Sequence, residues 1–136
     1  NMVCNNTYEW CENGISPQIE ELQEVPLEMI SWWVENHRKG NTLYIEDVLA
    51  LSEDDGVRQI LEPQDVKSLI AFPILNGMEC KGFVGFDSVK NKHIYSEKEQ
   101  KLLNFFAQLL VNVSNRIELE NDLRAEKIKA DQANKC

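Results

Sequence analysis

The sequence predicts an α+β domain in which an antiparallel sheet is covered by helices on one face and by short helices and loops on the other. Two observations support this prediction. The segments "KSLIAFPIL" and "CKGFVGFDSV" form an apolar hairpin, and a long amphipathic segment begins at Glu97. With 136 residues, the chain is long enough for one hydrophobic core and too short for two.

The first third of the chain predicts short elements. "MVCNNTYEWC" is typical of a strand because it is rich in Thr, Tyr and Trp. "SPQIEELQ" predicts a short helix, since Ser16 and Pro17 stand where helices begin. "LEMISWWVENHRKG" predicts a second helix that ends at Gly40.

The next two elements lead into the hairpin. "NTLYIEDV" predicts a strand, and "SEDDGVRQIL" predicts a short helix with Ser52 as its N-cap.

The hairpin is apolar on both faces because side chains alternate along a strand. In its first strand, one face carries Ser68, Ile70, Phe72 and Ile74, and the other carries Leu69, Ala71, Pro73 and Leu75. A sheet with two apolar faces must be covered on both. We expect the helix from Glu97 to cover one face. Residues 15–66 would cover the other, an arrangement that commonly leaves a pocket between sheet and loops.

The last helix has a clear start. Ser96 and Glu99 have the spacing of a capping box. A wide apolar stripe follows, made of Leu102, Phe105, Phe106, Leu109, Leu110 and Val113. Beyond it, Leu119, Leu123, Ala130 and Ala133 follow a narrow coiled-coil seam that Arg116 and Glu126 interrupt. A helix over 97–134 would be roughly 57 Å long, so we expect it to project beyond a domain whose radius of gyration is about 14 Å.

Charge and cysteine content exclude several classes of partner. The net charge of −9 argues against nucleic acid and against direct membrane contact. No apolar run approaches the roughly 20 residues of a membrane span. The four cysteines are Cys4, Cys11, Cys80 and Cys136, and they form no closely spaced metal-ligand pairs. We therefore expect reduced thiols, no metal site and a cytoplasmic location.

Four stretches together resemble a GAF domain, a sensor fold of bacterial signalling proteins. They are "NTYEWC", "PLEMISWW", "VKSLIAFPILNGMECKGFVGFDSV" and "YSEKEQKLLNFFAQLLVNVSNRIE". The hairpin followed by "YSEKE" is the most specific part. The resemblance implies a GAF sensor domain over residues 1–118. It also implies that the first helix and first strand of the family precede Asn1.

The tail "AEKIKADQANKC" resembles the helical linker that leads into the dimerisation helix of sensor histidine kinases. The resemblance implies that residues 119–136 connect the domain to an output module beyond Cys136. It further implies a two-component system and a homodimer that pairs through the C-terminal helix. The GAF domain of a diguanylate cyclase is the alternative parent.

No cofactor can be named from the ligand classes of the family. The cyclic-nucleotide class carries an Asn-Lys-x-Phe-Asp-Glu pattern, which this sequence lacks. Bilin-binding members usually have a cysteine beside a histidine, and here no cysteine is next to one. Free methionine sulfoxide reductases use several nearby cysteines, whereas Cys80 stands alone.

An unidentified small molecule remains an open expectation. The candidate ligand-binding residues are Tyr8, Trp10, Trp32, Trp33, Phe72, Phe86 and Asp87. The aromatic members would line a pocket, or they would simply fill the core, as most buried aromatic side chains do. Asp87 would bind a ligand or cap a nearby loop amide.

We therefore expect a regulatory sensor and dimerisation domain of a signal-transduction histidine kinase. A ligand-free domain that only dimerises and relays is the alternative. We expect no enzymatic activity in the domain, because no catalytic constellation is visible. His37 and His93 stand in polar contexts, beside Arg38 and Lys92, and are expected to be exposed.

Overall fold

The computed structural model describes residues 2–134. The chain divides into two compact units, Asn1–Tyr95 and Ser96–Cys136, and each is described by itself. The boundary expected at residue 118 falls inside the single helix of the second unit.

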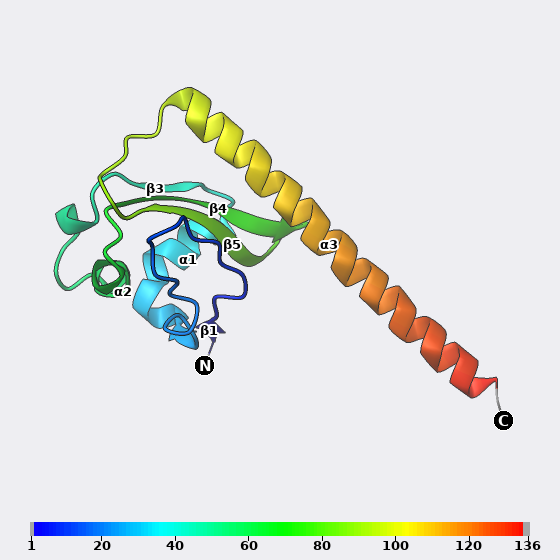
Figure 1. The fold of residues 1–136 in the computed structure, drawn as a ribbon. Coiled ribbons are helices and arrows are strands. Elements are labelled where there is room, and N and C mark those ends of the chain that lie inside the picture. The colour runs from blue at the N-terminus through cyan, green and yellow to red at the C-terminus, as the bar shows by residue number, and fades with distance from the viewer. Residues whose placement is uncertain (1, 135–136) are drawn as a thin grey trace. The chain divides into compact units, whose positions relative to one another are not determined.

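The first unit is built from strands and short helices (Figure 1). Its strands are β1 (Val3–Cys4), β2 (Val25–Pro26), β3 (Leu43–Ile45), β4 (Ser68–Asn76) and β5 (Glu79–Ser88). Its α-helices are α1 (Ser31–Arg38) and α2 (Gly56–Leu61). Three 3₁₀ turns join them, namely η1 (Leu27–Ile30), η2 (Val48–Ala50) and η3 (Glu62–Gln64).

The main sheet is antiparallel with the strand order β3-β4-β5. Strands β4 and β5 form the predicted hairpin, in which Asn76 pairs with Glu79 across a two-residue turn. Ala71 stands at the centre of the sheet, paired with Leu43 on one side and Gly85 on the other. The register places Leu69, Ala71 and Asp87 on one face and Ile70, Phe72 and Phe86 on the other.

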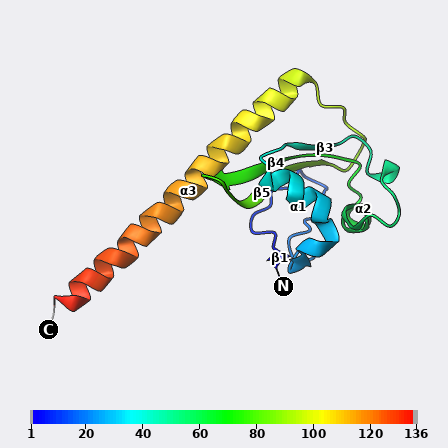
Figure 2. The ribbon, with the colours of Figure 1, turned by 180° about the vertical axis from the view of Figure 1, so that it is seen from behind.

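The core lies between the sheet and the two short helices. In Figure 1 and in the reverse view of Figure 2, α1 and α2 lie on the same side of the sheet. Buried side chains of β3 and β4 meet Trp33 of α1 in one hydrophobic cluster. Its buried members are Ile30, Trp33, Leu43, Ile45, Val48, Val57, Val66, Leu69 and Ala71. Burying each large apolar side chain stabilises the fold by about 1.5–3 kcal/mol.

Helix α1 begins where η1 ends and stops at a glycine, as its sequence predicts. Gly40 has a φ of +85°, a backbone conformation that most other residues avoid. Lys39 N–H and Gly40 N–H donate to the carbonyl oxygens of Glu35 and His37, which closes the last turn.

The contact between α2 and η1 is unusually close. A Cβ added to Gly56 would lie 1.8 Å from the carbonyl oxygen of Met29. The preceding residue, Asp55, caps α2 by accepting a hydrogen bond from Val57 N (2.9 Å). Ser52 was the expected cap, and this prediction is wrong. The helix begins three residues later because Asp55 is the residue whose carboxylate reaches the first free amide.

Residues 89–95 return across the end of the sheet and are held by hydroxyl groups. Ser68 Oγ accepts from His93 N (2.9 Å) and donates to Glu46 O (2.9 Å). Tyr44 Oη accepts from Tyr95 N (3.0 Å). Tyr95 is buried, so the last residue of the first unit is fixed to the sheet.

The second unit is the helix α3 (Glu97–Ala133), which has 37 residues. Its start is the predicted capping box, with Glu99 N donating to Ser96 Oγ (3.2 Å) and Ser96 N donating to Glu99 Oε1 (3.4 Å). Farther along, Arg116 and Glu120 form an ion pair of 3.2 Å, one helical turn apart.

The N-terminal segment departs from its predicted structure. Only Val3–Cys4 of the expected first strand is formed, and it pairs with β2. The helix expected from Ser16 is replaced by turns, in which Glu21 N and Leu22 N both donate to Gln18 O. A helix this short needs a packed apolar face to form, and the backbone N–H of Gln18 instead donates to the Glu9 carboxylate (2.9 Å).

No helix within residues 2–134 is both long enough and apolar enough to span a lipid bilayer.

Candidate functional site

An aromatic cluster lies between α1 and the sheet. Trp33 and His37 are one helical turn apart and point to the same side of α1. Their rings are 5.4 Å apart and perpendicular, and Phe83 of β5 covers both, at 5.1 Å from Trp33 and 5.7 Å from His37. Trp33 is 5% exposed and His37 is 2% exposed. The expectation that His37 is exposed is therefore wrong, because the residue faces the sheet and not the solvent.

Trp32 has a different role from its neighbour. Its indole Nε1–H donates to both carboxylate oxygens of Asp55, at 3.0 Å each. Because Asp55 also caps α2, this contact joins the two helices that cover the sheet. Trp32 and Trp33 lie together, with ring centroids 6.3 Å apart.

Asp87 lies on the same face of the sheet as the aromatic cluster, close to acidic and thiol groups of the N-terminal segment. Desolvation raises the pKa of Asp87 to about 6, and the negative charge of Glu9 adds to the increase. The pKa of the nearby Cys11 thiol is also raised, first by desolvation and then by Glu9 and Asp87. Within residues 2–134, Asp87 accepts no hydrogen bond from a loop amide, so the expected cap is not formed.

The other predicted residues do not join this cluster. Phe72 and Phe86 form an edge-to-face pair with centroids 6.2 Å apart, on the opposite face of the sheet. Tyr8 and Trp10 are 93% and 86% exposed. They lie on an irregular segment, because the strand that would have aligned them is not formed. The structure thus brings Trp32, Trp33 and Asp87 to one side of the sheet and leaves the remaining four elsewhere.

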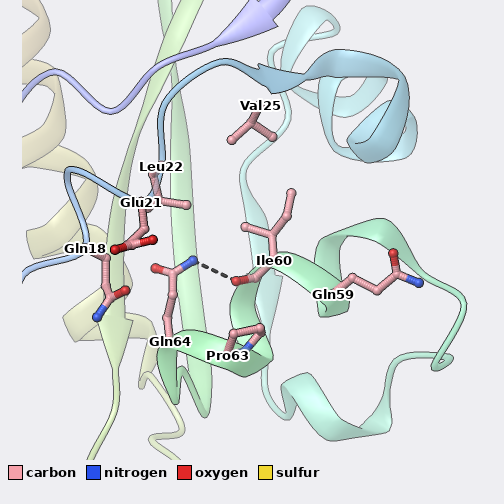
Figure 3. Close-up of a pocket in the computed structure, with 8 residues that line it drawn as sticks. All are labelled: Gln18, Glu21, Leu22, Val25, Gln59, Ile60, Pro63 and Gln64. Carbon is pink, nitrogen blue, oxygen red and sulfur yellow. Dashed lines mark hydrogen bonds between the residues drawn. The ribbon is translucent and has the colours of Figure 1, made fainter.

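An open cleft of about 420 Å³ lies next to the helices and is shown in Figure 3. One wall comes from the N-terminal segment and the other from α2 and η3. The residues that line it are Gln18, Glu21, Leu22, Val25, Gln59, Ile60, Pro63 and Gln64. None of these residues was singled out from the sequence.

The cleft offers hydrogen-bond donors and acceptors together with one carboxylate and several apolar side chains. Gln64 Nε2 donates to Ile60 O (2.7 Å), a bond drawn in Figure 3, and Gln59 Nε2 donates to Glu53 O (3.3 Å). The carbonyl oxygens of both amides and the Glu21 carboxylate remain as acceptors. A ligand that supplies N–H donors, or a positive charge, suits such a lining.

Three of the four cysteines lie within the described residues. Cys4, Cys11 and Cys80 are free and partly buried, and burial raises the pKa of Cys4. In the part of the chain that the structure describes, no three His, Cys, Asp or Glu side chains are placed to hold a metal ion. Cys136 lies outside the described residues.

Comparison with known proteins identifies the fold. No family model matches the chain, and no curated protein does so either. Among solved structures, the photoproduct state of GAF3 from Slr1393 of Synechocystis sp. PCC6803 has a TM-score of 0.70 and 16% identity, covering 86% of this chain and 77% of that one. The blue-light absorbing PixJ GAF domain of Thermosynechococcus elongatus has a TM-score of 0.67 and 19% identity, and the match covers 85% of this chain and 68% of that one.

A third structure comes from a signalling protein of another kind. It is a domain assigned to a two-component sensor histidine kinase from Sinorhizobium meliloti 1021, with a TM-score of 0.55 and 15% identity over 62% of this chain and 57% of that one. All three are similar to this chain in architecture. The chain therefore has a GAF-like α+β fold, as its hairpin and capping box indicate.

Proposed function

We propose that this chain is the regulatory sensor domain of a bacterial signal-transduction histidine kinase, which binds a small molecule and relays the signal through α3. One observation carries the proposal: a GAF-like unit is followed in the chain by a single helix of 37 residues. The same fold occurs in the light-absorbing PixJ domain and in the domain assigned to a sensor histidine kinase. A fold supports a class of function, whereas the ligand must be argued from the site.

The cleft beside α2 supports a small ligand that carries an amine. Its acceptors are the Glu21 carboxylate and the amide oxygens of Gln59 and Gln64, while Leu22 and Ile60 supply apolar surface. A volume of about 420 Å³ is within the usual range of ligand pockets. The net charge of −9 would also favour the approach of a cation.

A second copy of the chain is the proposed partner of α3. Leu119 and Leu123 are 59% and 56% exposed and follow coiled-coil spacing. The seam places the charged residues Arg116 and Glu126 among its apolar positions, and polar seam residues are known to fix register. In a parallel dimer, a ligand that binds one arrangement better would shift its population and change the geometry presented to the output module.

A ligand screen tests the proposal. Purified protein would be mixed with amine-bearing metabolites, and its melting temperature and bound mass would be followed by thermal shift and native mass spectrometry. We expect at least one compound to raise the melting temperature, and the Glu21→Gln variant to abolish that increase. Glu20→Gln is the matched control, because Glu20 is exposed and does not line the cleft. If none of the amine-bearing metabolites raises the melting temperature, a ligand-free relay domain is favoured.

A further inference from the structure

Three side chains that carry a carboxyl or carboxamide group are followed directly by a glycine. The pairs are Asn13-Gly14, Asp55-Gly56 and Asn76-Gly77. In such a pair the glycine nitrogen can attack the side-chain carbonyl carbon of the residue before it, because glycine has no Cβ that obstructs the approach. The attack requires the backbone between the two residues to rotate. The sequence does not distinguish the three pairs, whereas the structure does.

The Asp55-Gly56 pair is held on both sides. The Asp55 carboxylate accepts hydrogen bonds from Val57 N (2.9 Å) and from the indole N–H of Trp32 (3.0 Å). Gly56 is packed against Met29, whose carbonyl oxygen would lie 1.8 Å from an added Cβ. The carboxyl carbon is therefore kept away from the glycine nitrogen, and the backbone has no room to rotate.

The Asn76-Gly77 pair is exposed but belongs to the hairpin. Asn76 is the last residue of β4 and pairs with Glu79 across the turn, next to the pair between Leu75 and Cys80. Rotation of the Asn76 backbone would take this residue out of the strand ladder, whose hydrogen bonds fix the backbone dihedrals of paired residues. The fold therefore opposes the attack at this position.

The Asn13-Gly14 pair has neither restraint. Both residues are exposed, and they occupy the centre of a turn outside any strand or helix. In the described part of the chain, one backbone hydrogen bond spans this turn, from Ile15 N to Glu12 O (3.1 Å). Gly14 has a φ of +89°, and its N–H donates to no acceptor within residues 2–134. The attacking nitrogen is thus free, and rotation disturbs a single hydrogen bond.

We propose that Asn13 is a site of spontaneous deamidation, selected by the fold from the three pairs. The Gly14 nitrogen bonds to Asn13 Cγ, and the side-chain nitrogen leaves as ammonia, taking the proton of the Gly14 N–H. Water then opens the resulting succinimide ring to aspartate or to isoaspartate. This inference does not depend on the proposed sensing function.

The modification would change the loop that carries the turn. The ends of this loop are joined by the hydrogen bond from Gln18 N to the Glu9 carboxylate (2.9 Å), and Glu12 pairs with Lys90 of the segment after β5 (3.6 Å). Either product places a new carboxylate beside Glu12. In isoaspartate the backbone also runs through Cβ, which lengthens the turn by one atom. Gln18 lines the cleft, so the change occurs close to the proposed ligand site in the chain.

Peptide mapping of the aged protein tests the proposal. The purified 136-residue chain is incubated at mildly alkaline pH, digested and analysed by mass spectrometry, with chromatography separating isoaspartate from aspartate. We expect Asn13 to be converted at least tenfold faster than Asn76, and Asp55 to form no isoaspartate over the same period. In urea, which unfolds the hairpin, Asn13 and Asn76 are expected to react at similar rates.

Two variants assign the reaction to the predicted residue. Asn13→Gln is expected to remove the fast conversion, because a glutamine would have to close a six-membered ring, which forms more slowly. Asn76→Gln, the matched control, is expected to leave the fast conversion unchanged. The proposal is overturned if Asn76 reacts as fast as Asn13 in the folded protein, or if Asn13 stays intact there while it reacts in urea.

Discussion

At the scale of single residues, Asp87 is held where its charge is disfavoured. Its neighbourhood raises the carboxyl pKa to about 6, and the largest cause is desolvation. In an unfolded chain an aspartate has a pKa of about 3.9. Between these two values the folded state binds more protons than the unfolded state, so stability falls as the pH rises through this window. Above about pH 6 the Asp87 carboxyl is ionised in the folded state, and the full loss of stability is present.

Asp87→Asn is therefore expected to raise the melting temperature above pH 6, by a few degrees because solvent still reaches this exposed residue. The gain should shrink on acidification and vanish below about pH 4. Thermal melts from pH 3.5 to 8 measure it, and Asp122→Asn on exposed α3 is the control. A variant that is less stable than the unsubstituted protein at pH 8 would show that the ionised carboxylate makes a favourable contact.

His37 shows what residue-level reading can miss. Its neighbour Arg38 indicates a polar, exposed context, yet the side chain of His37 is 2% exposed. The signal that would have found it is spacing, because His37 follows the buried Trp33 by four positions on a helix. Trp33 itself was found, since a tryptophan on the apolar side of a predicted helix is seldom left in solvent.

At the scale of elements, Asp55 is the point where α1 and α2 are joined. The Asp55 carboxylate caps α2 by accepting a hydrogen bond from Val57 N, and it also accepts one from the indole N–H of Trp32. We expect Asp55→Ala to lower the free energy of unfolding by roughly 2–3 kcal/mol, because it removes a helix cap and leaves a partly buried donor unpaired. Urea unfolding followed by tryptophan fluorescence measures this loss.

Two further variants isolate the contact between Asp55 and Trp32. Asp54→Ala, at an exposed neighbouring position, should change stability by less than about 0.5 kcal/mol. A double-mutant cycle with Trp32→Phe should give a coupling of roughly 1 kcal/mol or more. Strict additivity of the two substitutions would contradict the view that this contact holds the helices together.

Elements with strong local signals were predictable from the sequence. The β4–β5 hairpin, the end of α1 at Gly40 and the capping box at Ser96 all depend on residues close in sequence. The segment over residues 5–24 was not predictable, since its β-prone residues have no strand to pair with and its few apolar residues do not form a helical face. The cleft was missed for a related reason: it needs residues 18–25 to lie against α2 and η3, which no local pattern encodes.

At the scale of the whole molecule, the proposed relay depends on α3 pairing with a second copy. The helix carries exposed leucines at coiled-coil spacing, and pairing with a second copy would cover them. Leu119→Lys combined with Leu123→Lys would place two charges in that seam. Ser114→Lys combined with Asn121→Lys adds the same charges at exposed positions off the seam.

Light scattering of the 136-residue chain over a concentration series is the most direct test of this account. We expect a mass approaching twice the 15.7 kDa of one chain, retained in the Ser114→Lys and Asn121→Lys variant and lost in the Leu119→Lys and Leu123→Lys variant. A strict monomer at every concentration, with residues 119–136 present, would contradict the proposal that this domain signals as a dimer through α3.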